Sequence, residues 1–413
     1  MTLDAVQTLA VAGVVAWLGQ VVCRRVGWLA RLSIPGPVVG GLAVAIALLA
    51  LRSAGMPAPE FDTTFQKTLL IAFFATLGFA ARLDLLRRGG PQVVVFLALC
   101  AVFAVMQSLV GIFVAQLFGL PSLFGVLVGV TTLSGGPATG AAFAPQFEAA
   151  GVTGAGAIAV ASAMSGIVLG GLLGGPLAVR LMRGQGAARP SGPSPAASVR
   201  PAVTASPASL APDARARPDP ADPAEDVPGE RRVFSSVVLL LVVIVGGQWV
   251  SAGIERLGIT LPGYIGAMLL AAIAVNGAEA LGRWRPSTAV LDMLGAVALS
   301  LFLAMWLMTL DLRQLHAVAD ALLVNLALQV ALIAAFIGVV FRAMGGDHDA
   351  AVMSGGFTGF MLGTTATALA VMRALVERHG AAPRAFLVAP LVGAFFIDFV
   401  NAIIITTFLN LLS

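Results

Sequence analysis

The chain has 413 residues, of which 59% are hydrophobic and only 11% are charged, and its mean hydropathy is +0.97. Soluble domains carry about a quarter charged residues, so this composition excludes an ordinary soluble protein and predicts an all-α polytopic membrane protein. The formal net charge of +4 comes from arginines that lie between apolar runs. That pattern is typical of membrane anchoring and excludes a nucleic-acid-binding patch.

Charge-poor apolar runs predict ten membrane-spanning helices, because one span needs about 20 apolar residues. Five lie in the first half, near residues 4–23, 36–51, 66–81, 92–118 and 152–179. Five more lie in the second half, near residues 233–254, 262–281, 289–310, 317–341 and 384–412. The chain is therefore expected to form an N-terminal five-helix repeat at 1–183 and a C-terminal repeat at 233–413.

The segment between the halves, residues 184–232, differs sharply from both. It holds ten of the 23 prolines of the chain, mixed with Ala, Ser, Asp and Arg. Such a composition cannot bury enough apolar surface to offset the entropy of ordering. The segment is predicted to be a disordered cytoplasmic linker, with a regulatory tail as the alternative.

Arginines in the loops predict the orientation of the chain. They follow the first, third and fifth spans, and again the seventh and ninth, whereas the loop after the second span is not net basic. The positive-inside rule places the arginine-bearing loops in the cytoplasm and both termini outside, on the periplasmic side. Since each half has an odd number of spans, the second half is expected to enter the membrane inverted.

A weak internal repeat supports this inversion. IPGPVVGGLAVAIALL at 34–49 resembles LPGYIGAMLLAAIAVN at 261–276, and the segment around Asp84 resembles that around Asp311. SGGPATG, which begins at Ser134, resembles SGGFTG, which begins at Ser354. The offset is 227 residues for the first two pairs and 220 for the third. Duplicated, inverted halves are a common architecture of secondary transporters.

Two apolar segments, residues 121–149 and 350–373, are too rich in Gly, Ser and Thr to be ordinary spans. In a helix, glycine costs about 1 kcal/mol and proline about 3 kcal/mol relative to alanine. Broken backbone survives at membrane depth only against protein or a water-filled cavity. Each segment is therefore predicted to be a re-entrant hairpin, the first entering from outside and the second from inside. The alternative is that small residues only allow close helix packing.

A helix break exposes backbone N–H groups at one tip, which bind a carboxylate, and C=O groups at the other, which with hydroxyls bind a sodium ion. The candidate substrate-binding residues are Ser134, Gly135, Gly136, Thr139, Gly140, Ser354, Gly355, Gly356, Thr365, Thr367 and Arg373. The candidate sodium ligands are Thr132, Gly359, Gly363, Thr364, Asp398 and Asn401.

Asp398 is the ionisable residue placed deepest in an apolar run, and Asn401 follows three residues later on the same helical face. A charge at this depth is costly. Asp398 is therefore interpreted as a sodium ligand or as the partner of a substrate ammonium, with an inter-helix clamp as the alternative. Asp84 and Asp311 lie at span ends, where solvation of the helix end explains them. Arg373 is a candidate for contact with a substrate carboxylate.

The motifs IPGPVVGGL (34–42), TLSGGPATGAA (132–142), DAAVMSGG (349–356) and LVGAFFIDFVNA (391–402) resemble the bacterial sodium/glutamate symporter family. The resemblance implies Na⁺-coupled uptake of L-glutamate by ten spans and two re-entrant hairpins, in a homodimer of the inner membrane that moves by an elevator-like step. The sequence has no Walker A loop, Ser–His–Asp pattern or HExxH motif, so neither an enzymatic activity nor a cofactor is expected. Pro137 and Ala138 differ from the family motif, so aspartate or another small dicarboxylate is the alternative substrate; a passive channel is a further alternative.

Overall fold

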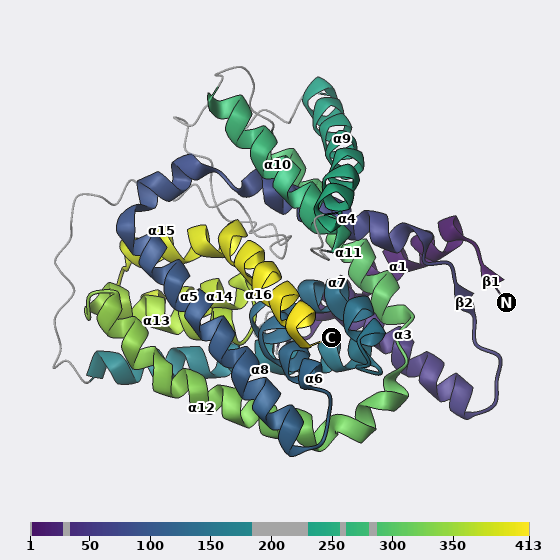
Figure 1. Ribbon diagram of the computed structural model, residues 1–413, viewed down its shortest axis with the longest axis horizontal. Helices are drawn as coiled ribbons and strands as arrows, with labels where there is room; N and C mark the ends of the chain where they lie inside the picture. Colours follow the sequence, from purple (N-terminus) through teal and green to yellow (C-terminus); the bar gives the residue numbers. More distant parts are fainter. Residues whose placement is uncertain (1, 28–33, 184–229, 257–261, 281–286, 413) are drawn as a thin grey trace. The chain divides into compact units, whose positions relative to one another are not determined.

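The computed structural model describes residues 2–27, 34–183, 230–256, 262–280 and 287–412. The first half contains α1 (Ala5–Arg25), α3 (Gly36–Ser53), α4 (Thr64–Ala80), α5 (Leu83–Leu117), α6 (Ser122–Val126), the π-helix η1 (Leu127–Ser134), α7 (Gly136–Ala149) and α8 (Ala155–Arg183) (Figure 1). The second half contains α9 (Glu230–Glu255), α10 (Gly263–Ala280), α11 (Thr288–Met308), the 3₁₀ helix η2 (Leu312–Val318), α12 (Ala319–Ala343), α13 (His348–Met361), α14 (Thr365–His379), α15 (Pro383–Leu391), the π-helix η3 (Val392–Phe396) and α16 (Ile397–Leu412). Two short strands, β1 (Thr2–Leu3) and β2 (Glu60–Phe61), pair in parallel.

Eight helices in the described part of the chain are long and apolar enough to cross a membrane, which confirms the helical membrane-protein class. The two other expected spans coincide with the shorter α4, of 17 residues, and with the uninterrupted series α15, η3 and α16. The predicted linker lies outside the described residues from 184 to 229. Its last three residues, from Glu230 onward, instead belong to the first turn of α9.

The order of helices in the first half recurs in the second half close to 227 residues later. The clearest case is α3, at 36–53, and α10, at 263–280. In the same register Gly136, where α7 begins, corresponds to Gly363, just before α14. The third motif pair does not follow this register, because Ser134 ends η1 whereas Ser354 lies in the middle of α13. The two glycine motifs therefore occupy different places in their hairpins.

The helices form two compact units. Unit 2 contains Gln66–Leu83 and Val203–Leu299, so its described helices are most of α4, together with α9, α10 and the start of α11. Phe74 stacks on Tyr264 with ring centroids 4.0 Å apart. Arg82 forms an ion pair with Glu279, and Asn276 donates to the Ala81 carbonyl at 2.7 Å. These contacts join the end of α4 to α10.

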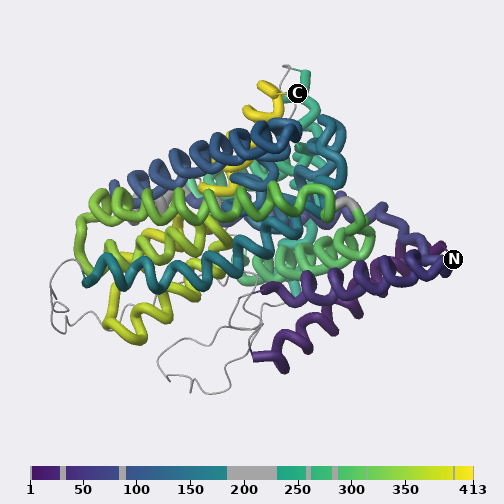
Figure 2. The backbone as a smooth tube through the Cα atoms, turned by 90° about the horizontal axis from the view of Figure 1, so that it is seen from below, coloured from purple at the N-terminus to yellow at the C-terminus, as the bar shows by residue number. Residues whose placement is uncertain are grey.

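Unit 1 contains Met1–Phe65, Asp84–Ala202 and Ser300–Ser413, and it includes both glycine-rich segments. Within it α5 and α12 run side by side, as the blue and green tubes show (Figure 2). The rings of Phe103 and Phe336 lie 5.2 Å apart, and Gln329 donates to the Gln107 carbonyl at 2.8 Å. Since the contact moves forward along α5 as it moves backward along α12, the two helices are antiparallel.

Candidate functional site

Residues 122–149 form a helical hairpin, named hairpin 1, in which α6 and η1 lead to a turn at Gly135 and Gly136 and α7 returns. The arms pack closely: a Cβ atom on Gly140 would lie 3.1 Å from the Thr132 methyl group. Gly136 has φ +69°, a left-handed conformation that favours glycine. Gly129 has non-helical dihedral angles within η1. The sequence therefore breaks the helix where the chain must reverse.

Residues 348–379 form a second hairpin, named hairpin 2, from α13 and α14. Its arms touch where a Cβ on Gly359 would lie 3.0 Å from the Ala368 Cα. Thr364 caps α14 by accepting from the Thr367 N–H at 3.3 Å. The arms have 14 and 15 residues. At about 1.5 Å per residue, neither reaches across the roughly 30 Å hydrocarbon core of a bilayer.

The turns of the two hairpins meet. A Cβ on Gly136 would lie 3.1 Å from the Thr364 Cγ2 and 3.7 Å from the Gly363 carbonyl oxygen. We call residues 134–136 and 362–364 the hairpin tips. Both α7 and α14 begin at these tips, so the unpaired N–H groups and positive dipole ends of two helices converge there.

α16 supplies the polar side chains nearest the tips. Asn401 is fully buried and donates from Nδ2 to the Ser134 hydroxyl at 2.9 Å. Its Oδ1 is buried and accepts no hydrogen bond from any residue that the structure describes. Asp398, one turn earlier, is half-buried, and its carboxylate forms neither a hydrogen bond nor an ion pair within the described chain. Thr365 connects the second tip to η3 by donating to the Gly393 carbonyl at 3.1 Å.

Three buried amides lie on α5 and α12: two of them bind the backbone of the hairpins, and the third binds the backbone of α5. Gln107 donates to the Met361 carbonyl of hairpin 2 at 2.8 Å, and Asn325 donates to the Val128 carbonyl of hairpin 1 at 2.9 Å. Gln329 joins them by its bond to the Gln107 carbonyl. Carbonyls freed by a broken helix must be paired inside the protein at membrane depth, and these amides satisfy two of them.

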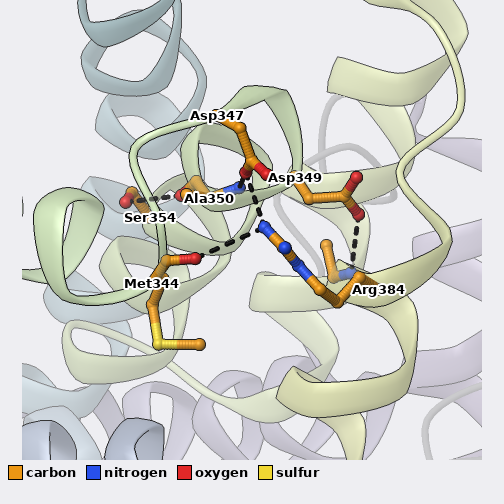
Figure 3. Close-up of polar contacts among 7 residues, drawn as sticks. Met344, Asp347, Asp349, Ala350, Ser354 and Arg384 are labelled. Atoms are coloured by element: carbon orange, nitrogen blue, oxygen red, sulfur yellow. Dashed lines mark hydrogen bonds and ion pairs between the residues drawn. The ribbon is translucent and has the colours of Figure 1, made fainter. Parts of the chain in front are cut away.

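The base of hairpin 2 is closed by polar contacts that Figure 3 shows. Arg384 donates to Asp347 at 2.5 Å and to the Met344 carbonyl at 3.3 Å. Asp347 also caps α13 by accepting from the Ala350 N–H at 2.9 Å, and Asp349 accepts from the Ala385 N–H at 3.1 Å. These contacts join the start of α13 to the start of α15.

Apart from Asp398, which lies on α16 one turn before Asn401, the predicted site residues fall into two groups. Those at the tips or in direct contact with them are Ser134, Gly135, Gly136, Gly363, Thr364, Thr365, Thr367 and Asn401. Those placed along the hairpin arms are Thr132, Thr139, Gly140, Ser354, Gly355, Gly356, Gly359 and Arg373.

The arm residues have packing contacts of their own. The Ser354 hydroxyl donates to the Ala350 carbonyl at 2.7 Å, and Thr132 lies 2.8 Å from the Ser162 hydroxyl of α8. Arg373 is exposed on α14 and lies more than two turns beyond the tip. Asp311 caps η2 by accepting from the Arg313 N–H at 3.1 Å, which agrees with its interpretation as a helix-end residue.

Sequence reasoning missed Gln107, Asn325 and Gln329. The sequence did contain a signal for them, because an amide in the middle of an apolar span is costly to bury unless it forms a hydrogen bond. Asn325 and Gln329 also stand four residues apart, and so on one helical face. Their partners could not be named, because those are main-chain carbonyls of distant segments.

Comparison with known proteins gives a consistent result. A family model described as sodium/glutamate symporter matches residues 1–381. The chain is 38% identical over 417 aligned residues to the sodium/glutamate symporter of Escherichia coli (strain K12), covering 99% of this chain and 98% of that relative. It is 36% identical over 412 residues to the sodium/glutamate symporter of Haemophilus influenzae, covering 97% and 96%. The similarity extends over both hairpins.

Proposed function

Because this chain belongs to the sodium/glutamate symporter family, we propose that it is a multi-pass membrane protein that imports L-glutamate together with Na⁺. The observation that carries the proposal is the meeting of the two hairpin tips beside Asn401. Interrupted helices that converge inside a membrane protein are the usual binding site of secondary transporters. The hairpins are proposed to be re-entrant, in two inverted repeats, as the antiparallel packing of α5 and α12 supports.

The converging N-termini of α7 and α14 suit a substrate with two carboxylates. Each helix end offers unpaired N–H groups and a positive dipole, which together stabilise an anion. Ser134 adds a hydroxyl group at the first tip, and Thr365 adds one directly after the second. The carboxylate of Asp398, one turn from Asn401 on α16, is proposed to bind the substrate ammonium or a sodium ion.

Sodium requires several oxygen ligands, and the tips offer them. The Gly363 carbonyl lies close to Gly136, and the Asn401 Oδ1 has no hydrogen-bond donor among the described residues. An amide oxygen left unpaired in this way costs about 1–3 kcal/mol, so a bound cation would relieve the cost. We propose Gly363, Thr364 and Asn401 as sodium ligands, and Asp398 as a further one where it does not bind the substrate ammonium.

The transport step is proposed to be elevator-like. Both hairpins, α16 and the three amides belong to unit 1, as required if the whole site moves through the membrane as one body. Pairing a cation with an anionic substrate lowers the cost of carrying charge across the bilayer. We further propose a homodimer in the inner membrane, with both termini on the periplasmic side.

The test is uptake of radiolabelled L-glutamate into proteoliposomes under an inward Na⁺ gradient, with K⁺ in place of Na⁺ as the control. Competition by L-aspartate, D-glutamate, succinate and 2-oxoglutarate identifies the substrate class. We expect uptake only with Na⁺ and strongest competition from amino dicarboxylates. Uptake that ignores the Na⁺ gradient would overturn the coupling, and conductance far above carrier turnover would indicate a channel.

A further inference from the structure

A cavity of about 610 Å³ lies between the C-terminal ends of α8 and α12, apart from the hairpin tips. Its wall is largely apolar and includes Leu177, Ile337 and Phe341. Two cationic side chains, Arg180 and Arg342, also line it. No acidic side chain is among its lining residues in the described part of the chain. The cavity thus combines two positive charges with an apolar surface.

The proposed topology places the two arginines at equivalent depth in the membrane. Arg180 lies in the last turn of α8 and Arg342 in the last turn of α12, and both side chains are exposed. The loops after both helices are those that the positive-inside rule places in the cytoplasm. The shared cavity shows that the two helix ends lie on the same side of unit 1. Both guanidinium groups therefore belong at the headgroup level of the cytoplasmic leaflet.

Only one class of ligand matches both features. Guanidinium groups bind phosphate oxygens in a two-pronged geometry, so the arginines suit an anionic phosphate. A free phosphate would not use the apolar wall, whereas a lipid acyl chain would cover it. The headgroup of a zwitterionic lipid brings its own cation, which Arg180 and Arg342 would repel. Basic pockets between spanning helices on the cytoplasmic side are suited to anionic lipid headgroups.

We propose that this cavity binds an anionic phospholipid of the cytoplasmic leaflet, with its phosphate between Arg180 and Arg342 and an acyl chain against the apolar wall. α8 packs against α7 and α13, and α12 bonds hairpin 1 through Asn325. A lipid bridging α8 and α12 therefore stabilises the two helices that support both hairpins from behind. The bound lipid is expected to raise the stability of this helix pair without contacting the substrate.

The experiment titrates the purified full-length protein in detergent with dioleoyl phosphatidylglycerol, dioleoyl phosphatidylcholine or glycerol 1-phosphate. Bound ligand is counted by native mass spectrometry, and the melting temperature is recorded. Wild type is compared with the double variant Arg180→Gln/Arg342→Gln. The matched control is Arg183→Gln, which removes an exposed arginine from the same helix end but outside the cavity wall.

Phosphatidylglycerol is expected to bind and raise the melting temperature of wild type. The double variant should bind it about thirtyfold more weakly, and Arg183→Gln nearly as well as wild type. If the double variant does not fold, the single variants should each weaken binding about fivefold. Unchanged binding in these variants, equal loss in Arg183→Gln, equal binding of phosphatidylcholine, or glycerol 1-phosphate as effective as the lipid would each overturn the proposal. None of these readouts depends on glutamate transport.

Discussion

At the scale of single residues, the polar side chains of α16 are the most important for the proposed binding site. Asn401 pairs through its Nδ2 with Ser134, whereas its Oδ1 and the carboxylate of Asp398 have no bonding partner among the described residues. Unpaired polar groups at membrane depth persist when a ligand satisfies them. Gln107 and Gln329 also have a buried amide oxygen without a partner among the described residues, so it is the place of Asn401 beside the first tip that supports its proposed role as a sodium ligand.

Replacing Asn401 with alanine should therefore weaken sodium activation more than it weakens folding. We expect the Na⁺ concentration for half-maximal glutamate uptake to rise about 10- to 100-fold, since a bond to a charged group contributes about 1.5–3 kcal/mol. The measurement is the Na⁺ dependence of initial uptake in proteoliposomes. Thr407→Ala is the control, because Thr407 is exposed on α16 and bonds only its own helix, at the Ile403 carbonyl. An unchanged Na⁺ dependence in Asn401→Ala would remove this residue from the sodium site.

Asp398→Asn keeps the size of the side chain and removes its charge. If Asp398 binds the substrate ammonium or a sodium ion, uptake should fall at least about tenfold while the protein yield stays near that of wild type. The uptake rate and the amount of folded protein by size-exclusion chromatography are measured together. Full transport at normal yield would leave Asp398 as a structural residue only.

At the scale of elements, the two hairpins contact each other at their tips, where Gly136 lies close to Thr364. Gly136 has φ +69°, and a Cβ there would press on the Thr364 methyl group at 3.1 Å. Contacts this short force a neighbour to move, and a left-handed conformation costs a non-glycine residue roughly 1–2 kcal/mol. Tip geometry is therefore sensitive to one methyl group.

We expect Gly136→Ala to raise the KM for glutamate several-fold and to lower the melting temperature slightly. Adding Thr364→Ser, which removes the opposing methyl group but keeps the capping hydroxyl, should restore part of the affinity. Gly151→Ala is the matched control, because Gly151 has φ +92° but no atom within 4 Å of its Cβ position. The same KM change in both alanine variants would mean that backbone strain, and not tip contact, is responsible.

At the base of hairpin 2, the Arg384–Asp347 ion pair is expected to contribute little to stability. The Arg384–Asp347 pair is 33% and 50% exposed at its two side chains, so solvent screens it and its contribution is about 0.2–1 kcal/mol. A double-mutant cycle with Asp347→Asn and Arg384→Gln, measured by chemical denaturation, should give a coupling energy in that range. Asparagine preserves the cap of α13. A coupling above about 2 kcal/mol would show that the pair is shielded from solvent in the membrane-bound protein.

At the scale of the whole molecule, the proposed inverted repeat would account for how the hairpins come together. Counterpart helices α5 and α12 lie antiparallel within unit 1, and counterpart glycines at 136 and 363 lie at adjoining tips. A duplication in which both copies had the same orientation would place the two fourth helices parallel. An odd number of spans in each half is the simplest way to reverse the second copy.

This topology predicts which segments are accessible from which side. In a Cys23→Ala/Cys100→Ala background, Thr2→Cys should react with an impermeant maleimide in intact cells, and Ser206→Cys should react only after permeabilisation. The readout is a gel shift of the purified protein. Labelling of both cysteines from the same side would contradict five spans per half and the inverted repeat with it.

The helical class, the positions of most spans and the two segments that form helical hairpins follow from local sequence. Hydropathy over about 20 residues decides whether a helix crosses lipid. Glycine and proline each cost a helix about 1 and 3 kcal/mol, so a segment rich in them is a poor continuous span. Local sequence also supplied a misleading equivalence, because Ser134 and Ser354 begin similar motifs but lie at a tip and in mid-helix.

The tertiary structure decided which groups meet. Asn401 reaches Ser134 across 267 residues, Gln107 reaches Met361 across 254, and Gln329 reaches Gln107 across 222. Single amides such as these have no periodic signature, and their partners include main-chain carbonyls that every residue carries. Only the packing of α5, α12 and α16 around the hairpins selects those partners. The residues that face the proposed ligands are therefore fixed by long-range contacts, whereas the helices that present them are fixed by composition.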